Sequence, residues 1–169
     1  MAYEWHQAVL TQMLANRGVL PHGLLLSGPE NTGKAEFAHT LATLLLCSNA
    51  ARDAITPCGL CHSCRLIAAN THPDLIQVGL ETVEDGKQAK EIKVDQIRTL
   101  CRRLSQTSQF GGYKIAIIQP ADRMNRNAAN SLLKTLEEPP EETLLLLVSS
   151  QPALLPATIR SRCRQVKLP

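Results

Sequence analysis

The sequence predicts an α/β domain in which a parallel β-sheet carries helices on both faces and a small insert interrupts the pattern. Short, almost continuous apolar runs alternate with segments of helical periodicity along the chain. Strands that alternate with helices form right-handed βαβ units and a parallel sheet. Continuous apolar runs are typical of parallel strands that are covered on both faces. A group of cysteines between residues 47 and 64 marks the insert.

The first part of the chain is expected to contain a helix, a strand, a turn, a second helix and the insert. Helical spacing of apolar residues at the start of the chain stops before Gly18, a common helix terminator. Asn49, Pro57 and Gly59 break the helical pattern inside the insert. The expected elements are a surface helix over residues 3–16, a strand over 23–26, a turn over 28–33, a buried helix over 35–46, the insert over 47–64 and a helix over 61–69.

The remainder of the chain continues the alternation of strands and helices. Asp95 is expected to cap a helix whose inner face carries Ile97, Leu100 and Leu104. Asn125 is expected to cap a later helix, which Pro139 ends. The expected elements are a strand over residues 75–78, an exposed loop over 82–90, the helix from 95, a strand over 114–118, a helix over 125–138, a strand over 143–148, a short helix over 154–160 and a strand over 165–168.

Length and composition indicate one globular domain over residues 1–169. The hydrophobic fraction is 44% and the charged fraction 20%, which is ordinary for a globular protein and unlike a disordered tail. Aromatic residues make up 3% and the net charge is +3, so neither stacking surfaces nor a strong basic field favours direct nucleic-acid binding. The chain has no apolar run of about 18 residues and no signal-peptide pattern, which predicts a cytoplasmic protein without membrane contact.

The turn after the first strand has the pattern of a phosphate-binding loop. Gly28, Gly33 and Lys34 fit G-x-x-x-x-G-K, but Ala35 stands where a nucleotide-hydrolysing loop has Ser or Thr. In such a loop, backbone N–H groups and the helix N-terminus favour phosphate, and the lysine adds a positive charge. We assign Gly28, Gly33 and Lys34 to a degenerate phosphate loop, and leave open whether ATP or ADP binds. The alternative is an ordinary glycine-rich turn with an exposed lysine.

The strand over residues 114–118 ends in Gln119 and Pro120. A P-loop ATPase needs carboxylates at the end of such a strand, one to hold the metal and one to position the attacking water. Gln119 and Pro120 supply neither, and Asp122 lies beyond the strand end, where it is best interpreted as a turn or helix-entry residue. The sequence therefore predicts a P-loop sheet without an ATPase activity of its own.

Cys47, Cys58, Cys61 and Cys64 have the spacing of a structural zinc site. A short insert with few apolar residues needs a metal to hold its shape. Scattered core cysteines or a redox pair are the alternatives, and the regular spacing of the thiols counts against both. Because the protein fills all four positions, no coordination position is open for catalysis.

The other cysteines and nearby histidines are expected to be structural. Cys101 lies on the apolar face of its helix and is expected in the core. Cys163 falls outside the metal spacing, and His62 and His72 are expected at the surface.

Arg160, Arg162 and Arg164 alternate just before the last expected strand. The simplest interpretation is a solvated basic edge. The other is an arginine finger, a guanidinium presented to the γ-phosphate that another subunit holds, which accelerates hydrolysis by roughly 10³–10⁵.

Four features together resemble the amino-terminal AAA+ module of bacterial clamp-loader subunits, which belong to the DNA polymerase III holoenzyme. They are the loop at residues 28–34, the four-cysteine insert, the run NSLLKTLEEPP at residues 130–140 and the tripeptide at residues 161–163. The resemblance covers residues 5–168. Motor subunits of this family keep Lys-Ser or Lys-Thr in the loop and Asp-Glu after the strand. This chain departs from both, so it resembles a non-catalytic, stator-like member.

The resemblance implies that Arg162 projects into the ATP site of a neighbouring motor subunit and promotes hydrolysis there, with Ser161 and Cys163 placing it. A sensor position of the family corresponds to Ser149 or Ser150. The implied partners are the motor ATPase subunits and the delta subunit, and, through the complex, the sliding clamp and primer-template DNA. Family members also have a small helical domain and a collar domain, which are expected to be absent from this chain.

Two other functions compete with this one. The first is an active P-loop ATPase motor subunit, in which Ala35 is tolerated and Asp122 recruits the metal; it predicts intrinsic ATP turnover. The second is a zinc-dependent nucleic-acid-binding module, which predicts salt-sensitive DNA binding by the isolated chain.

Overall fold

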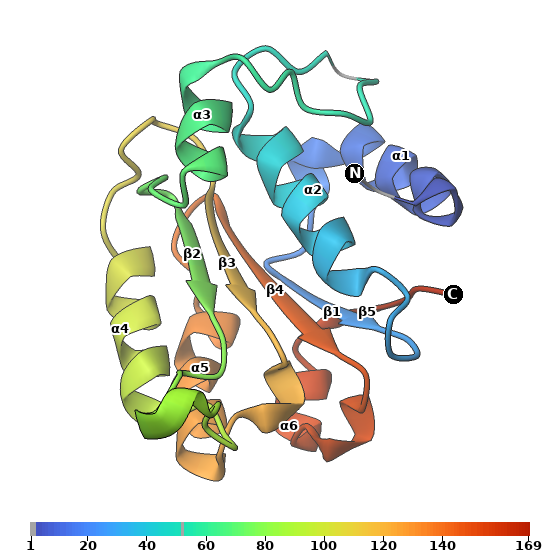
Figure 1. Ribbon diagram of the computed structural model, residues 1–169. Helices are drawn as coiled ribbons and strands as arrows, with labels where there is room; N and C mark the ends of the chain where they lie inside the picture. Colours follow the sequence, from blue (N-terminus) through green and yellow to red (C-terminus); the bar gives the residue numbers. More distant parts are fainter. Residues whose placement is uncertain (1–2, 52) are drawn as a thin grey trace.

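The computed structural model describes residues 3–51 and 53–169, and a five-stranded parallel sheet lies at its centre (Figure 1). The strand order is β2-β3-β4-β1-β5, and each neighbouring pair is parallel. The strands are β1 (Gly23–Ser27), β2 (Leu75–Val78), β3 (Lys114–Ile118), β4 (Thr143–Ser149) and β5 (Arg164–Lys167). Among the described residues, no helix combines the length and the apolar character that crossing a membrane requires.

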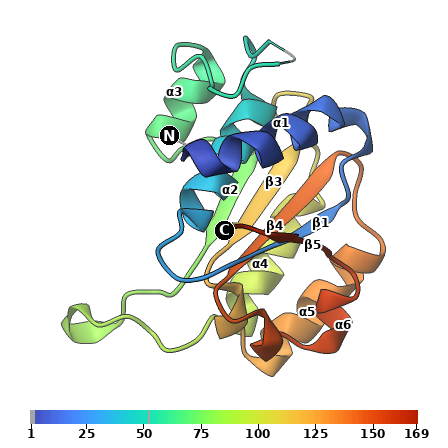
Figure 2. The same ribbon diagram turned by 90° about the vertical axis from the view of Figure 1, so that its right-hand side faces the viewer.

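Helices cover both faces of the sheet, as the two views show (Figures 1 and 2). One layer consists of α1 (Gln7–Ala15), α2 (Lys34–Leu46) and α3 (His62–Ala68), and the other of α4 (Val94–Leu104), α5 (Arg126–Glu137) and α6 (Ala157–Arg160). The described residues also contain five 3-10 helices: Glu4–His6, Arg17–Val19, Glu84–Gly86, Ala121–Arg123 and Pro152–Leu154.

The two layers bury two separate apolar clusters, one on each face. Leu24 and Leu26 of β1 pack with residues of α1 and α2, whereas Leu25 packs with residues of α4, α5 and α6. Successive strand residues point to opposite faces, so each central strand contributes to both clusters. This confirms the expected parallel sheet with helices on both faces.

Strand β1 occupies the position that matters for function. It pairs with β4 on one side and β5 on the other, in a register that aligns Gly23 with Leu145 and Ser27 with Ser149. Because the strands are parallel, the segments that follow β1, β3 and β4 leave the sheet at the same edge. The expected phosphate loop, Gln119 with Pro120, and Ser150 therefore meet there.

The predicted cap of α4 is wrong. The helix begins at Val94, its N-cap is Lys93, and the Lys93 backbone N–H donates to Gln96 Oε1 at 2.9 Å. Asp95 lies inside the first turn, where it forms an exposed ion pair with Arg98 at 3.6 Å. The Gln96 side chain supplies the reciprocal bond of a capping box, so the helix starts two residues earlier than an Asp95 cap would place it.

The two short terminal helices are less regular than expected. Residues 3–16 form the 3-10 helix Glu4–His6 followed by α1, and residues 154–160 are interrupted by Pro156, the N-cap of α6. Proline has no backbone N–H and disfavours the helical conformation in the residue before it. By contrast, Asn125 Oδ1 caps α5 as predicted, accepting from the Ala128 N–H at 2.8 Å.

Candidate functional site

The phosphate-loop candidate connects β1 to α2, and close backbone packing requires its glycines. Gly33, the N-cap of α2, has a left-handed backbone conformation with φ of 76°, which residues other than glycine rarely adopt. A Cβ atom on Gly28 would lie 2.3 Å from the Leu168 carbonyl oxygen, which no backbone allows without a shift. Both positions therefore need glycine for the fold itself, whether or not a phosphate binds.

A cavity of about 450 Å³ lies beside this loop. Residues from the loop, from the segment after β3 and from the segment after β4 line it, including Lys34, Gln119, Pro120 and Ser150. The lining also contains two acidic residues, Glu30 and Glu36, and one aromatic residue, Tyr3. The cavity thus lies where the predicted phosphate loop would place a nucleotide, but its wall carries more acidic than basic side chains.

The Lys34 side chain is turned back onto its own loop. It is buried, with 6% of its surface exposed, and its Nζ donates a hydrogen bond to the Pro29 carbonyl oxygen. The Thr32 hydroxyl donates to the same carbonyl at 3.0 Å. Burial lowers the pKa of Lys34, while the nearby charges of Glu30 and Asp122 act in the opposite direction. The expected alternative of an exposed lysine is therefore wrong for this structure.

Tyr3 closes over the loop, which the sequence analysis did not anticipate. A Cβ on Gly33 would lie 2.1 Å from the Tyr3 ring, so the ring rests on the glycine backbone. Tyr3 stacks on Trp5 with ring centroids 4.5 Å apart, and His6 is buried between these rings and Phe37. The one available signal was the concentration of aromatic residues at the start of a chain that has few of them.

Of the two candidate sensor residues, Ser150 lines the cavity and Ser149 does not. The buried Ser149 hydroxyl donates to Asp122 Oδ1 and accepts from the Gln151 N–H at 3.0 Å. Asp122 belongs to the 3-10 helix Ala121–Arg123, which agrees with its interpretation as a turn residue. Its carboxylate is thereby joined to the end of β4.

The four cysteines of the insert come together as predicted. Their sulfur atoms all lie within 4.8 Å of one another, and the Cys58–Cys64 and Cys61–Cys47 pairs are each 3.9 Å apart. A tetrahedron with metal–sulfur distances of about 2.3 Å has sulfur–sulfur edges of about 3.8 Å. The donor set and its spacing therefore fit one tetrahedrally bound metal ion.

Backbone groups around the cluster favour thiolate. The N–H groups of Leu60 and Cys61 donate to Cys58 Sγ and lower its pKa. Burial opposes ionisation of Cys61, but the N–H groups of Cys64 and Ser48, together with the thiols of Cys64 and Cys58, outweigh it and lower its pKa to about 6. Burial and the neighbouring thiols raise the pKa of Cys64 to about 12. A bound cation would favour the thiolate form of all four cysteines, since thiolates are the form that ligates metal.

His72 is buried rather than at the surface, so that prediction is wrong. Its Nδ1 accepts from the Asp74 N–H at 3.0 Å, and its Nε2 lies 3.3 Å from the Ser63 hydroxyl on α3. These bonds join the helix of the insert to the start of β2 and offset the cost of burying a polar ring. His62 is exposed, as expected, and lies edge-on to Phe110.

Cys101 and Cys163 lie outside the metal cluster. Cys101 is half-buried against the cluster formed by α4 and α5, in agreement with the prediction. Cys163 is buried beside Gly23 and Leu136, and burial raises its pKa to about 11. Cys163 thus fixes the chain that follows Arg162 to the core.

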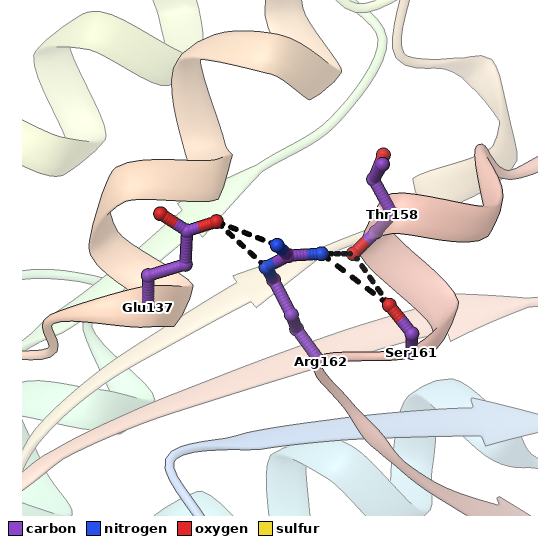
Figure 3. A network of polar contacts seen from close by, with 4 residues as sticks. All are labelled: Glu137, Thr158, Ser161 and Arg162. Atoms are coloured by element: carbon purple, nitrogen blue, oxygen red, sulfur yellow. Dashed lines mark hydrogen bonds and ion pairs between the residues drawn. The ribbon is translucent and has the colours of Figure 1, made fainter.

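Arg162 lies between the end of α6 and the start of β5, and several polar groups hold its guanidinium (Figure 3). Nε donates a hydrogen bond to Glu137 Oε1 at 2.8 Å, and Nη2 forms an ion pair with the same oxygen at 2.7 Å. Nη1 donates to the Thr158 carbonyl oxygen at 2.9 Å and to the Ser161 hydroxyl at 3.3 Å. About a third of the side chain, 35%, remains exposed. Among the described residues, neither Arg160 nor Arg164 forms an ion pair.

Arg162 and the phosphate loop lie at opposite edges of the sheet: Arg162 at the edge where the strands begin, and the loop at the edge where they end. A Cβ on Gly23, the first residue of β1, would lie 3.5 Å from the Arg162 carbonyl oxygen. The loop begins after Ser27 at the other end of this five-residue strand, which is about 16 Å away at the usual rise of a strand. The structure therefore does not bring Arg162 to the loop of its own chain.

Comparison with known proteins identifies a family. Residues 6–169 match the family described as "DNA polymerase III, delta subunit". The chain is 46% identical over 167 residues to DNA polymerase III subunit delta' of Pseudomonas aeruginosa, covering 99% of this chain and 48% of that protein. It is 34% identical to the delta' subunit of Escherichia coli, covering 96% of this chain and 47% of that protein. The chain thus spans about half the length of these relatives.

A solved structure supports the same fold. The crystal structure of a DNA polymerase III gamma subunit-related protein from Thermotoga maritima aligns with a TM-score of 0.67 and 22% identity. The alignment covers 97% of this chain and 46% of that protein. At this identity the similarity concerns the fold, which is the AAA+-type sheet expected from the sequence.

Proposed function

Because this chain belongs to the DNA polymerase III subunit family whose curated relatives include delta' subunits, we propose that it serves as a stator-like subunit of the clamp loader without ATPase activity of its own. In this proposal Arg162 completes the ATP site of a neighbouring motor subunit, where its positive charge stabilises the transferring γ-phosphoryl group. The assembled complex then helps to load the sliding clamp onto primer-template DNA during replication.

The position of Arg162 is the observation that carries the proposal. The guanidinium is partly exposed and anchored, yet it lies at the sheet edge opposite to its own phosphate loop. An arginine so placed cannot serve the loop of its own chain, but it is available to a subunit that packs against this edge. Its anchoring favours an arginine finger over a merely solvated basic edge, because a preorganised charge stabilises a transition state without reorganisation at the moment of reaction.

The state of the loop supports the absence of hydrolysis. Ala35 has no hydroxyl for Mg²⁺, Lys34 is bonded to the Pro29 carbonyl, and Gln119 and Pro120 stand at the strand end. Asp122, the residue on which the active-ATPase alternative depends, is bonded to Ser149. A nucleotide that entered the cavity would find no carboxylate at the position that ordinarily holds the metal.

The remaining parts of the proposal follow from the cysteine cluster and the family. Cys47, Cys58, Cys61 and Cys64 hold a structural Zn²⁺ that stabilises the insert, with no open position for catalysis. The motor ATPase subunits and the delta subunit are the proposed direct partners. The proposed compartment is the cytoplasm, whose reducing conditions keep such cysteines available for metal.

The test uses the full-length subunit assembled with its partner subunits. Arg162→Ala is expected to lower ATP turnover by the complex by roughly 10³-fold for the site that it serves, whereas Arg164→Ala, an exposed arginine on β5, is the matched control. Equal turnover in these two complexes would refute the proposal. Intrinsic turnover by this subunit alone, abolished by Lys34→Ala, would instead favour the motor ATPase, and salt-sensitive DNA binding by the isolated chain would favour the nucleic-acid-binding module.

A further inference from the structure

We propose that Glu137 is the positioning residue of Arg162, and that it acts on the neighbouring ATP site only through that arginine. This inference rests on the proposed function of Arg162. Glu137 is the last residue of α5 and Arg162 follows α6, so the pair joins two helices that pack on the same face of the sheet. Figure 3 shows the carboxylate and the guanidinium facing each other across the gap between these helices.

The pairing fixes the orientation of the guanidinium as well as its place. Glu137 Oε1 accepts a hydrogen bond from Nε at 2.8 Å and forms an ion pair with Nη2 at 2.7 Å, along one edge of the planar group. The Thr158 carbonyl and the Ser161 hydroxyl accept from Nη1 on the other side. Arginine is planar and its donors form a rigid fork, so contacts on two sides leave it little freedom to rotate.

The network leaves a donor for an incoming acceptor. An arginine side chain has five N–H groups, and the hydrogen bonds to Glu137, Thr158 and Ser161 use three of them among the residues that the structure describes. The other two belong to Nη2, whose recorded contact there is the ion pair with Glu137. A phosphate oxygen can therefore accept from Nη2 while the contact with Glu137 persists. This distinguishes a positioning residue from an inhibitory contact, which would have to break before Arg162 could act.

The neighbouring glutamate makes the inference specific. Glu138 is adjacent in the chain and equally acidic, but it is the C-cap of α5, is exposed and lies outside this network. A general effect of negative charge at the end of α5 would apply to both residues. An effect that requires contact with Arg162 applies to Glu137 alone.

The experiment is a double-mutant cycle with the full-length subunit in the assembled complex, measured as steady-state ATP hydrolysis. Glu137→Ala is expected to lower kcat about tenfold to a hundredfold, as misplacing a reacting group by about 1 Å does, with KM unchanged because the neighbour's own nucleotide contacts are intact. Glu137→Gln, which keeps an acceptor oxygen, is expected to lose less, and Glu138→Ala to be unchanged. In the Arg162→Ala background, Glu137→Ala is expected to have no further effect.

Each other outcome overturns the inference in a recognisable way. If Arg162→Ala leaves hydrolysis unchanged, the proposed function fails and this inference fails with it. If Arg162→Ala lowers hydrolysis but Glu137→Ala does not, only the inference fails. An equal loss from Glu137→Ala in both backgrounds would show a structural role independent of Arg162. A gain in turnover would show that the contact between Glu137 and Arg162 inhibits hydrolysis. Glu137→Gln retains the size of the side chain, so it decides the question if the alanine variant does not fold.

Discussion

Removing the Asp74 carboxylate is expected to loosen the segment between α4 and β3 and its contact with the insert. Asp74 is buried, with 2% of its surface exposed. Its two oxygens accept from the backbone N–H groups of Gln109 and Phe110 at 2.8 and 3.0 Å. The Phe110 ring in turn lies against His72 and His62, with ring centroids 5.0 and 5.6 Å apart. Asp74 thus holds the loop that covers the side of the insert.

The magnitude follows from the two hydrogen bonds. A hydrogen bond to a charged group contributes about 1.5–3 kcal/mol when it is buried. Both acceptor bonds are only partly buried, and the freed N–H groups can reach water, so we take the lower value for each and expect Asp74→Ala to cost about 3 kcal/mol. For a domain of this size about 1 kcal/mol corresponds to about 2–4 °C in Tm, so the expected decrease is about 6–12 °C.

The assay is thermal unfolding of the zinc-loaded protein followed by circular dichroism. Asp74→Asn, which keeps one acceptor oxygen, is expected to lose about half as much as Asp74→Ala. The matched control is Asp95→Asn, because Asp95 is exposed and forms only a surface ion pair with Arg98, worth less than about 1 kcal/mol. Equal melting temperatures for the Asp74 and Asp95 variants would refute the reasoning.

Three further predictions concern the metal site, the loop and a buried histidine. Cys61→Ser is expected to lose most of the bound zinc, because one of the thiolates is removed, whereas Cys101→Ser, outside the cluster, retains it; equal zinc content by atomic absorption would contradict the assignment. Gly28→Ala is expected to destabilise the protein by about 1–3 kcal/mol, because the new Cβ meets the Leu168 carbonyl oxygen, whereas Gly18→Ala meets nothing within 4 Å; coincident urea midpoints would argue against the close packing of the loop. Burial lowers the pKa of His6 below 6.5, with Glu36 acting in the opposite direction. The contribution of His6 to the free energy of unfolding is therefore constant above about pH 6.5 and falls as the pH decreases below it, because the unfolded chain binds the proton more readily than the folded one. His6→Phe is expected to flatten this part of the pH dependence, and superimposable pH profiles of wild type and variant would count against it.

The fold was predictable because its main signals are short in range. Strand β3 is an almost continuous apolar run, Asn125 caps α5 within three residues, and the cysteine spacing brings the sulfur atoms together through local turns. The cap of α4 was not predictable in the same way, because Lys93 has no side-chain preference for that position. The choice between Lys93 and Asp95 was decided by which residue Gln96 could reach.

The interpretation of His72 shows a different limit. A histidine near a metal site but outside its spacing has no local feature that distinguishes a surface position from a buried one. Burial depends on the arrival of Phe110 and Ser63 beside it, from segments on either side in the sequence. The same holds for the Lys34 amine, because the turn of the loop decides whether it faces solvent or the Pro29 carbonyl.

The sequence alone determined where the strands lie, which loop resembles a phosphate site and which cysteines can share a metal, because each depends on periodicity or on spacing within a few residues. Only the tertiary structure decided which groups meet across the domain. Asp122 finds Ser149 across 27 positions and Arg162 finds Glu137 across 25. It also placed Arg162 at the edge of the sheet opposite to its own loop, because the order and direction of the strands, which no local pattern encodes, determine at which edge each connecting segment lies.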